Sequence, residues 1–551
     1  MQTDLFARLQ TNATKHPDKP AFIYPHHGIW KTVTYAQLLD STNRFAHGLQ
    51  ACSLTPGMRA AVMTPPGIEF FPFAFALLKL GIIPIIMDPA IGLKKLGPCI
   101  NETEPEIFIG NTLTHALRII LGWGKKTIKH NLTIEHVKHQ ALNVKSLIHP
   151  SSFILQNSSP AAIIFTSGST GTPKGVLYSQ ENFSAQLDLL QQTFQITLDE
   201  IDLPAFPLYA IIDALLGVTS VIPDVTFPVP GKTNPEKVLN AIQKFKVTNM
   251  FASPVVLDIL CSFALSGDAV IASTSKRTLR LHRPTTAVPL KVELSSLKRV
   301  ITAGAPATIP LQEKFRKLLD DKTNLFGTYG ATETLPIAKV ESREIFSLRG
   351  KTAQGAGVCL GKPIEGVTVR IIQITDEPIK EWQESLTVET NVVGEITVQS
   401  AATTRSYIHR EDATRLSKIR IGEDIIHRTG DVGYFDEEGR LWYCGRKSQR
   451  VETNRSTFFT EQIEGVFNIH PSAYRTALVG VEKEPVLWIE PKQGKVNQDK
   501  IKQELMELAS NHPQASKIRT FLFMKKFPTD VRHNSKIIRE ELTLLAEKRI
   551  R

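Results

Sequence analysis

One stretch constrains the fold of this 551-residue chain more than any other, namely residues 161–183, AAIIFTSGSTGTPKGVLYSQENF. Its apolar start, which ends in Ile163, Ile164 and Phe165, is typical of a buried strand. A run of threonine, serine and glycine begins directly afterwards at Thr166. The stretch therefore predicts a buried strand that leads into a flexible polar loop.

The loop has the composition of a phosphate-binding site. Its glycines let backbone N–H groups approach an anion, its hydroxyls add donors, and Lys174 adds a compact positive charge. Pro173 before Lys174 and Gly175 after it exclude the Walker P-loop, whose lysine lies between a glycine and a serine or threonine. A surface linker is the alternative, but linkers rarely follow a buried apolar strand. We expect a polyphosphate to be bound by Thr166, Ser167, Gly168, Ser169, Thr170, Gly171 and Lys174.

Length and composition set the broad class. The chain is longer than one ordinary domain, so we expect a large domain and a small one. Its 42% hydrophobic and 22% charged residues are typical of a globular protein. The net charge of +11 favours anionic ligands or a membrane surface, but it is spread over a long chain and does not indicate a nucleic-acid partner.

The cysteines favour a reducing compartment. They are odd in number and far apart and form no CxxC pair, which argues against a disulfide framework and a zinc site. The first residues lack the basic and apolar regions of a secretory signal. We therefore expect a cytoplasmic protein. The cysteines are Cys52, Cys99, Cys261, Cys359 and Cys444.

Apolar periodicity predicts an α/β scaffold. Residues 4–14 read as a helix, and Thr34 can cap a second one. The most apolar stretch, FFPFAFALLKLGIIPIIMDP, is interrupted by Lys79 and Gly81, so we predict a buried helix to Leu80 and a buried strand from 82 to 87 rather than a membrane span. Similar alternation up to the central loop predicts a sheet covered on both faces.

Two basic segments stand apart from this pattern. Residues 114–138 combine aliphatic residues and Trp123 with several lysines, so they form either a solvated helix and loop or a surface for lipid or a partner enzyme. Residues 275–289, SKRTLRLHRPTTAVP, have little periodicity and predict a surface loop.

Two motifs downstream offer nucleotide-binding chemistry. A strand from Arg299 breaks into Gly304, Ala305 and Pro306, which lets the backbone lie flat against a planar ring. The following segment, NLFGTYGATETLPIA, supplies the stacking ring of Tyr329 between Thr328 and Gly330. The same segment ends in the hydroxyl of Thr332 and in Glu333, a hard oxygen ligand for Mg²⁺.

Two further motifs complete the set. In HRTGDVGYFDEEGRLWYCGRK we expect Asp431 to follow a Thr-Gly turn and to accept hydrogen bonds from ribose hydroxyls, and Arg446 to add a donor. A hairpin through DEEG separates the two. Near the C-terminus, Lys536 lies in a short loop before the last helix, where a lysine can swing into a site.

These motifs, in this order over about residues 20 to 540, resemble those of the adenylate-forming superfamily of acyl-CoA synthetases, luciferases and peptide-synthetase adenylation domains. The resemblance implies ATP and Mg²⁺, with Thr166 and Glu333 positioning the metal and Thr332 on the α-phosphate. Adenine would lie between Gly304–Pro306 and Tyr329. Lys536 would bridge the carboxylate and the α-phosphate in the transition state.

The resemblance also implies a domain organisation. Residues 1–445 would form a large AMP-binding domain of sheets layered with helices. Residues 446–551 would form a small, mobile α+β lid that rotates at a hinge formed by Lys447 and Ser448. The first half-reaction would join a carboxylate to ATP, giving acyl-AMP and pyrophosphate.

The chain departs from the usual acyl-CoA synthetase pattern after GRK. Arg455, within Asn454 to Thr457, stands where those enzymes carry a glycine that borders the pantetheine tunnel. GRKSQRVET, VFNIHPSAYRTALVGV and RHNSKIIRE resemble the olefin-biosynthesis β-lactone synthetase branch. That resemblance implies a long-chain β-hydroxy acid whose own hydroxyl displaces AMP. Acyl-CoA synthesis, transfer to a carrier protein and an inactive nucleotide-binding protein remain the alternatives.

Overall fold

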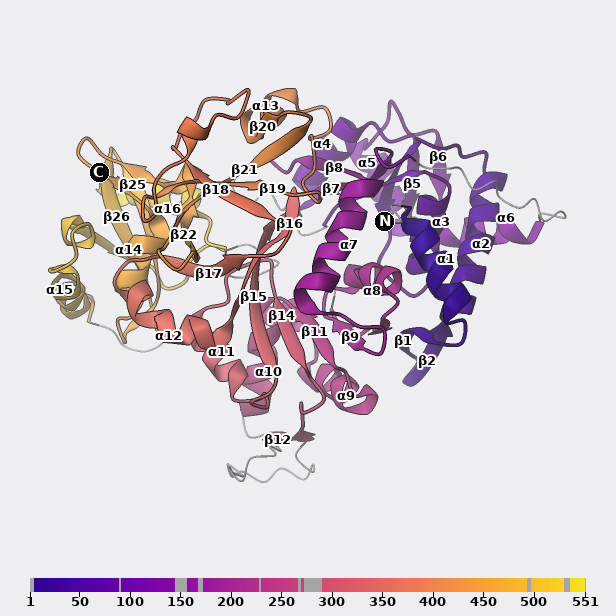
Figure 1. Cartoon of the computed structure of the whole chain (residues 1–551), viewed down its shortest axis with the longest axis horizontal. Coiled ribbons are helices and arrows are strands. Elements are labelled where there is room, and N and C mark those ends of the chain that lie inside the picture. Colours follow the sequence, from indigo (N-terminus) through magenta and orange to yellow (C-terminus); the bar gives the residue numbers. More distant parts are fainter. Residues whose placement is uncertain are drawn as a thin grey trace.

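The structure is a computed structural model, and it describes residues 4–88, 91–143, 156–166, 172–226, 229–265, 269–271, 290–492, 497–529 and 536–550. Figure 1 shows the N-terminal helices at one end of the molecule and the C-terminal part, coloured orange to yellow, at the other. Predictions for residues 167–171 of the phosphate loop and for the basic loop 275–289 fall outside the described residues.

The larger sheet runs through the middle of the molecule. Its strand order is β18-β19-β21-β22-β17-β16-β15-β14-β11-β9-β10-β1-β2, and β20 pairs with β21. The pairs from β15 to β1 are parallel, and the remaining pairs are antiparallel. Its strands are β1 (Pro20–His26), β2 (Ile29–Thr34), β9 (Ile201–Pro204), β10 (Thr219–Val221), β11 (Asn249–Ala252), β14 (Arg299–Thr302), β15 (Asn324–Ala331), β16 (Thr334–Glu341), β17 (Val358–Pro363), β18 (Thr368–Ile372), β19 (Gly394–Gln399), β20 (Lys418–Ile421), β21 (Asp424–Phe435) and β22 (Leu441–Arg446).

A second sheet carries the central strand predicted from the sequence. Its order is β6-β5-β3-β4-β7-β8, with only the β7–β8 pair antiparallel. Helix α7 contacts β8 of this sheet and β16 of the larger one, so it packs between the two. The strands are β3 (Arg59–Met63), β4 (Ile83–Ile86), β5 (Ile107–Gly110), β6 (His130–Leu132), β7 (Pro160–Phe165) and β8 (Gly175–Ser179).

The helices begin where the sequence offers caps. Thr34 and Gln37 form a capping box at the start of α2, as the sequence predicted for Thr34. Asp4 caps α1 through the N–H groups of Phe6 and Ala7. The helices of the large part are α1 (Leu5–Lys15), α2 (Tyr35–Ala51), α3 (Phe70–Lys79), α4 (Leu93–Thr103), α5 (Thr112–Leu121), α6 (Ile134–Asn143), α7 (Gln180–Phe194), α8 (Ala210–Leu216), α9 (Pro235–Phe245), α10 (Pro254–Leu265), α11 (Ile309–Arg316), α12 (Ser342–Ala353) and α13 (Glu411–Ser417).

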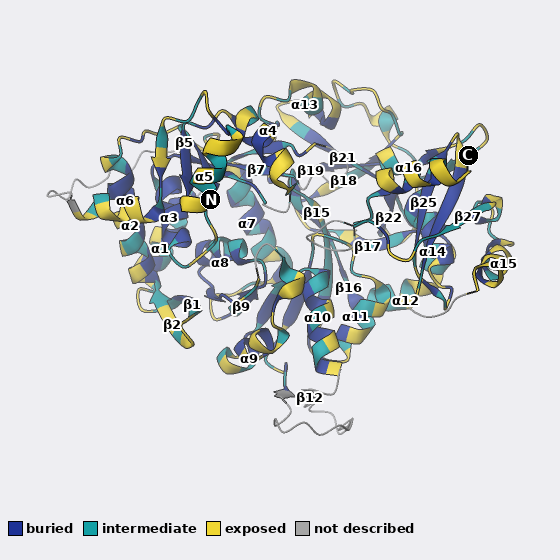
Figure 2. Ribbon diagram, turned by 180° about the vertical axis from the view of Figure 1, so that it is seen from behind, coloured by how far each residue is buried: buried dark blue, intermediate teal, exposed yellow. Residues whose placement is uncertain are grey.

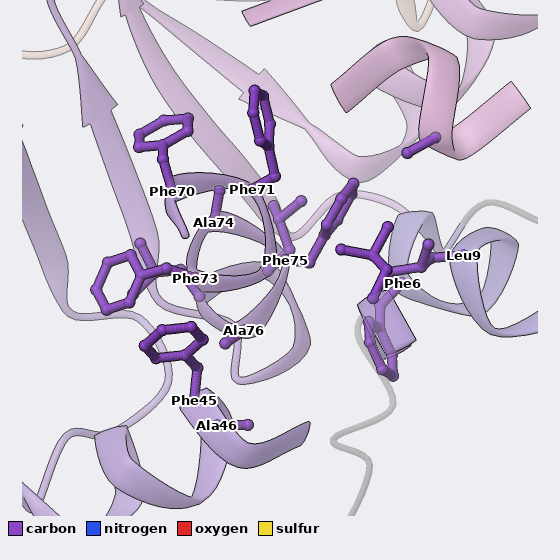
Figure 3. Packing of buried hydrophobic residues seen from close by; sticks show 14 of the residues in the cluster. Phe6, Leu9, Phe45, Ala46, Phe70, Phe71, Phe73, Ala74, Phe75 and Ala76 are labelled. Atoms are coloured by element: carbon purple, nitrogen blue, oxygen red, sulfur yellow. The ribbon is translucent and has the colours of Figure 1, made fainter. Parts of the chain in front are cut away.

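The most apolar stretch forms the buried helix α3 and the buried strand β4, as predicted. Figure 3 shows the phenylalanines of α3 packed against α1 and α2. The rings of Phe45 and Phe73 meet edge to face with centroids 5.6 Å apart, and Phe71 lies 4.8 Å from Phe22 of β1. Among the described residues, no helix has the length and apolar character that crossing a bilayer requires.

The C-terminal part has its own core and an α+β organisation. Strands β25 (Ala473–Val481), β26 (Glu484–Pro491) and β27 (Thr520–Phe523) form one sheet, covered by α14 (Thr460–Phe467), α15 (Gln498–Ala509) and α16 (Arg539–Ile550). Arg539 at the start of α16 makes a bidentate ion pair with Glu464 of α14, at 2.6 and 3.0 Å. In Figure 2 the strands of this sheet are mostly dark blue, whereas α15 is largely exposed.

Short strand pairs complete the described chain. Strands β12 (Ala269–Ile271) and β13 (Leu290–Val292) pair in parallel. Strands β23 (Val451–Glu452) and β24 (Thr457–Phe458) form a hairpin at the start of the C-terminal part. Arg455 lies exposed in the turn of this hairpin, where its N–H donates to the Thr453 hydroxyl.

Candidate active site

One cavity of about 2650 Å³ collects every predicted site residue that the structure describes. Segments distant in the sequence meet there because they follow the ends of neighbouring strands or lie on facing strands. The predicted residues that line the cavity are Thr166, Lys174, Gly304, Ala305, Pro306, Thr328, Tyr329, Gly330, Thr332, Glu333, Asp431, Arg446, Lys447, Ser448 and Lys536.

The predicted phosphate loop connects β7 to β8, and hydrogen bonds between Thr166 and Lys174 join its two ends. The N–H of Thr166 donates to the carbonyl of Lys174, and the N–H of Lys174 donates to the Thr166 hydroxyl, both at 3.0 Å. The Lys174 ammonium lies 4.8 Å from the ring centroid of Tyr407. Burial lowers the pKa of Lys174, an effect that Glu333 opposes and Arg410 strengthens. The base of the loop therefore presents a partly buried cation to the cavity.

The residues predicted to bind adenine follow β14 and lie within β15. The chain leaves β14 at Thr302 and reaches Gly304, whose φ of +91° is in the region that favours glycine. The Thr328 hydroxyl donates to the Thr302 carbonyl at 3.1 Å and joins the two strands. Tyr329, on β15, is held by its hydroxyl, which donates to Asp431 Oδ2 at 2.6 Å. The ring of Tyr329 is therefore fixed on the cavity wall.

Asp431 and Arg446 face each other across β21 and β22. Arg446 Nε lies 3.0 Å from Asp431 Oδ1 as an ion pair without the alignment of a hydrogen bond, so Oδ1 keeps its capacity to accept one. Burial raises the pKa of Asp431, while Arg446, the Tyr329 hydroxyl and Lys536 act in the opposite direction. The effect of Lys536 on this carboxyl indicates that the lysine lies nearby in the same cavity.

The expected Thr-Gly turn before Asp431 is wrong. Strand β21 continues from Asp424 to Phe435, and Asp431 lies inside it. Gly430 has a φ of +71°, and the register shifts in this region, so the dipeptide forms an irregularity within the strand. The predicted DEEG hairpin is correct and joins β21 to β22.

Glu333 is held by a polar cluster that the sequence did not reveal. Tyr407 Oη donates to Glu333 Oε1 at 2.5 Å, and Thr404 donates twice to the Glu333 carbonyl. Burial by itself raises the pKa of Glu333, but the hydrogen bond from Tyr407 and the charge of Lys418 hold it below the ordinary value. The carboxyl is therefore an anion.

Lys418 and His427 lie side by side on β20 and β21 behind this carboxylate. Burial lowers the pKa of Lys418 to about 7, with Glu333 opposing and Lys174 adding to the shift. Burial and then Lys418 lower the pKa of His427 to about 3. His427 Nδ1 lies 3.1 Å from the Ser417 carbonyl, which fixes the proton there and leaves Nε2 as an acceptor. Lys418 lies in none of the motifs found in the sequence, and His427 begins the HRTGDVG motif but was assigned no role there.

The donors present suit Mg²⁺. Thr166 and Glu333 both line the cavity and offer a hydroxyl and a carboxylate, which are hard oxygen ligands. The described residues contain no group of three histidine, cysteine or acidic side chains placed to hold a metal. A site with one carboxylate matches the way proteins hold Mg²⁺ together with substrate phosphates.

Buried side-chain atoms that lack a hydrogen-bond partner are concentrated in residues that line this cavity. Buried polar groups are normally hydrogen-bonded, so several atoms without a hydrogen bond in the lining of one cavity indicate a polar ligand. Of the seven such side-chain atoms among the described residues, five belong to cavity residues: Asn249 Oδ1, Thr302 Oγ1, Gln312 Oε1, His427 Nε2 and Asp431 Oδ1.

Another part of the same cavity is apolar. Residues 206–218, FPLYAIIDALLGV, include a short 3₁₀ turn (Pro207–Tyr209) and α8, and they contribute Phe206 and Ile212 to the lining. The Tyr209 ring stacks on Phe251 at 3.9 Å. Phe73 and Leu77 of α3 also line the cavity. An alkyl chain therefore fits beside the polar residues.

One of the two residues predicted to form a hinge, Lys447, is tied to the large part. Arg446 ends β22, and Lys447 to Gln449 form a 3₁₀ turn. Lys447 Nζ lies 3.2 Å from the buried Glu395 carboxylate and donates to the Thr375 carbonyl at 2.8 Å. Lys447 is therefore anchored.

Comparisons with known proteins agree with this geometry. The family model "AMP-binding enzyme" matches residues 9–408. The chain is 37% identical to the olefin beta-lactone synthetases of Xanthomonas campestris pv. campestris, over 94% of this chain and 91% of that one, and Stenotrophomonas maltophilia, over 98% of each. It also resembles O-succinylbenzoate coenzyme A synthetase from Bacillus subtilis, solved with ATP and magnesium, with a TM-score of 0.74 and 20% identity over 97% of this chain and 98% of that one. This chain is therefore an adenylate-forming enzyme of the AMP-binding family, related over nearly its whole length to the olefin beta-lactone synthetases.

Proposed function

We propose that this protein adenylates a long-chain β-hydroxy carboxylic acid with ATP and Mg²⁺ and then closes the acyl-AMP to a β-lactone with release of AMP. The observation that carries the proposal is one cavity whose lining contains both Lys174, Glu333 and Asp431 and the apolar residues of α3 and α8. The identity with two olefin beta-lactone synthetases supports the choice of acid and product.

In the first step, a carboxylate oxygen attacks the α-phosphorus, the bond to the bridging oxygen breaks, and pyrophosphate leaves. Two anions must approach each other, so the cations Lys174 and Lys536 lower the barrier by neutralising charge. Bound Mg²⁺, held by Thr166 and Glu333, would supply further positive charge to the phosphates. Asp431 Oδ1 would accept a hydrogen bond from a ribose hydroxyl, and the fixed ring of Tyr329 would stack on adenine.

In the second step, the β-hydroxyl oxygen attacks the acyl carbonyl carbon. The bond from that carbon to the AMP oxygen breaks, AMP leaves, and the hydroxyl proton is released. The nucleophile belongs to the substrate, so positioning in the cavity supplies much of the rate enhancement. No thiol acceptor is required.

The test is to incubate the protein with ATP, Mg²⁺ and a long-chain β-hydroxy acid, with and without coenzyme A, and to identify products by mass spectrometry and NMR. We expect a β-lactone and AMP without coenzyme A. The unsubstituted fatty acid of equal length is the matched control, because it can be adenylated but cannot close. A thioester formed only with coenzyme A, or equal turnover of both acids, would contradict the proposal.

A further inference from the structure

Helix α5 exposes its apolar side chains instead of burying them. Leu113, Ile119, Ile120 and Leu121 are 66%, 68%, 78% and 48% exposed, and no residue of the helix is buried. Leu113 and Ile120 are seven residues apart and therefore share one face of the helix. Single exposed aliphatics are common on protein surfaces, but four on one ten-residue helix form a patch.

Three half-buried residues of α5, namely Leu117, His115 and Arg118, dock the helix on the rest of the protein. Leu117 of α5 packs on the cluster around the buried Trp123. The ring of His115 lies 3.0 Å from the Leu132 carbonyl, and the Arg118 guanidinium lies over the Phe108 ring. Gly122 ends the helix in the left-handed conformation. The helix is thus docked with its aliphatic face directed outward.

Positive charge surrounds the face. The chain has no acidic residue between Glu106 and Glu135, whereas exposed lysines follow the helix. Helix α4 and Leu117 of α5 pack in the same apolar cluster around Trp123, and α4 adds the exposed Leu93. Figures 1 and 2 both show α4 and α5 as neighbours. The exposed lysines of this region are Lys94, Lys95, Lys125, Lys126 and Lys129.

The nearest acidic side chains on α4 and before β5 do not offset these lysines, because they pair with arginines. Glu102 accepts two hydrogen bonds from Arg410. Glu104 and Glu106 both lie within 3.7 Å of the Arg59 guanidinium. The exposed charge around α5 is therefore carried by lysines.

We propose that this face, defined as Leu93, Leu113, Ile119, Ile120 and Leu121 with the five lysines, binds the surface of an anionic lipid bilayer. An aliphatic helix face bordered by lysines is the pattern of helices that lie in the plane of a membrane interface. The aliphatic side chains enter the acyl boundary, and the lysines reach the headgroups of anionic lipids. This inference does not rest on the proposed reaction, because binding is measured without turnover.

The experiment is co-sedimentation of the full chain with vesicles of phosphatidylcholine alone and of phosphatidylcholine with phosphatidylglycerol in equal parts, without ATP or acid. We expect binding to the anionic vesicles that weakens as salt is raised. The variant Ile119→Asp/Ile120→Asp should bind anionic vesicles at least about tenfold more weakly than the wild type. The variant Lys125→Gln/Lys126→Gln should lose several-fold affinity, and only for anionic vesicles.

The matched control is Leu544→Asp/Leu545→Asp, an adjacent exposed aliphatic pair on α16, which should bind as the wild type does. Circular dichroism of each variant checks that the fold is kept. Three results would overturn the proposal: no sedimentation with anionic vesicles, equal affinity for uncharged vesicles, or wild-type binding by Ile119→Asp/Ile120→Asp. Association of protein copies without vesicles that Ile119→Asp/Ile120→Asp abolishes would also overturn it, by assigning the face to a protein contact.

Discussion

At the scale of single residues, the site depends on charges withdrawn from water. Asp431 and Glu333 line one cavity, where Asp431 is buried and Glu333 half-buried, and the buried Lys418 lies behind Glu333. Each of the three charges is offset by a neighbour of opposite charge or by a hydrogen bond. Buried charges are costly unless paired, so these groups are sensitive to changes in their partners.

Lys536 is the residue whose loss should most affect adenylation. In Lys536→Ala the charge that offsets the approach of carboxylate to phosphate is lost, and we expect the rate of acid-dependent pyrophosphate release to fall by about 10²-fold or more. The control is Lys526→Ala, which removes an exposed lysine of the same C-terminal part. Equal rates for Lys536→Ala and the wild type would remove this lysine from the mechanism.

Lys418 should make stability depend on pH. Burial lowers its pKa to about 7 from the ordinary 10.5, so between these values the unfolded chain binds a proton that the folded protein does not. By linkage, stability then rises with pH, by about 2 kcal/mol at most between pH 7 and pH 9, and this rise is absent below the folded pKa. Urea unfolding at pH 6, 7, 8 and 9 should show the rise in the wild type.

The variant Lys418→Met carries no such proton and should lack this rise. The free energy of unfolding of Lys418→Met minus that of the wild type should therefore be larger at pH 7 than at pH 9. The same slope in both proteins would show that Lys418 is ionised normally in the folded state.

The sequence predicted some of these residues and not others, for a physical reason. Asp431, Glu333 and Lys174 lie in short motifs with distinctive neighbours, so composition and order marked them. Tyr407, Lys418 and His427 come from a loop and two strands, and they meet only because β20 pairs with β21 and Tyr407 bridges Val176. Lys418 and His427 meet across a short hairpin, whereas Tyr407 reaches Glu333 from 74 residues away in the sequence, and such a distant contact leaves no local pattern.

At the scale of elements, helices were predicted best where periodicity and caps agree. Helix α2 begins directly after its predicted cap Thr34, and α3 ends at Lys79, one residue before the predicted Leu80 and shortly before Gly81. The Thr-Gly dipeptide before Asp431 was misread because strand irregularities and turns use the same residues. Strand pairing, not composition, decides between them.

Helix α16 is held to the C-terminal sheet by a buried ion pair, and removing one partner should be severe. In Arg539→Met the Glu464 carboxylate stays buried without its bidentate partner, and we expect a loss of about 3–5 kcal/mol in the stability of this part. Calorimetry should then show an early transition of the C-terminal part ahead of the large part. The control Lys548→Met, on the exposed side of the same helix, should melt as the wild type does.

At the scale of the whole molecule, the C-terminal part and the large part share the cavity. Lys536 and Arg539 line it from one side, and Thr166, Glu333 and Asp431 line it from the other. Arg455, in the segment that departs from the coenzyme A pattern, does not line the cavity in this arrangement. A change in its position requires rotation of the C-terminal part.

The anchoring of Lys447 places any such rotation at Ser448 or beyond. Lys447 stays bound to Glu395 and Thr375 of the large part, whereas Ser448 is the next residue of the same short turn. Proline is tolerated in the first turn of a helix, but it restricts φ to about −65°. The variant Ser448→Pro should therefore keep the present arrangement of the C-terminal part and hinder its rotation into a second arrangement. We expect a normal first burst of pyrophosphate release, followed by a steady-state turnover that is slower than that of the wild type by about tenfold or more. Quenched-flow measurement of both phases checks this, with Ser448→Ala as the control for the lost hydroxyl. Unchanged turnover in Ser448→Pro would mean that one arrangement of the two parts serves both steps.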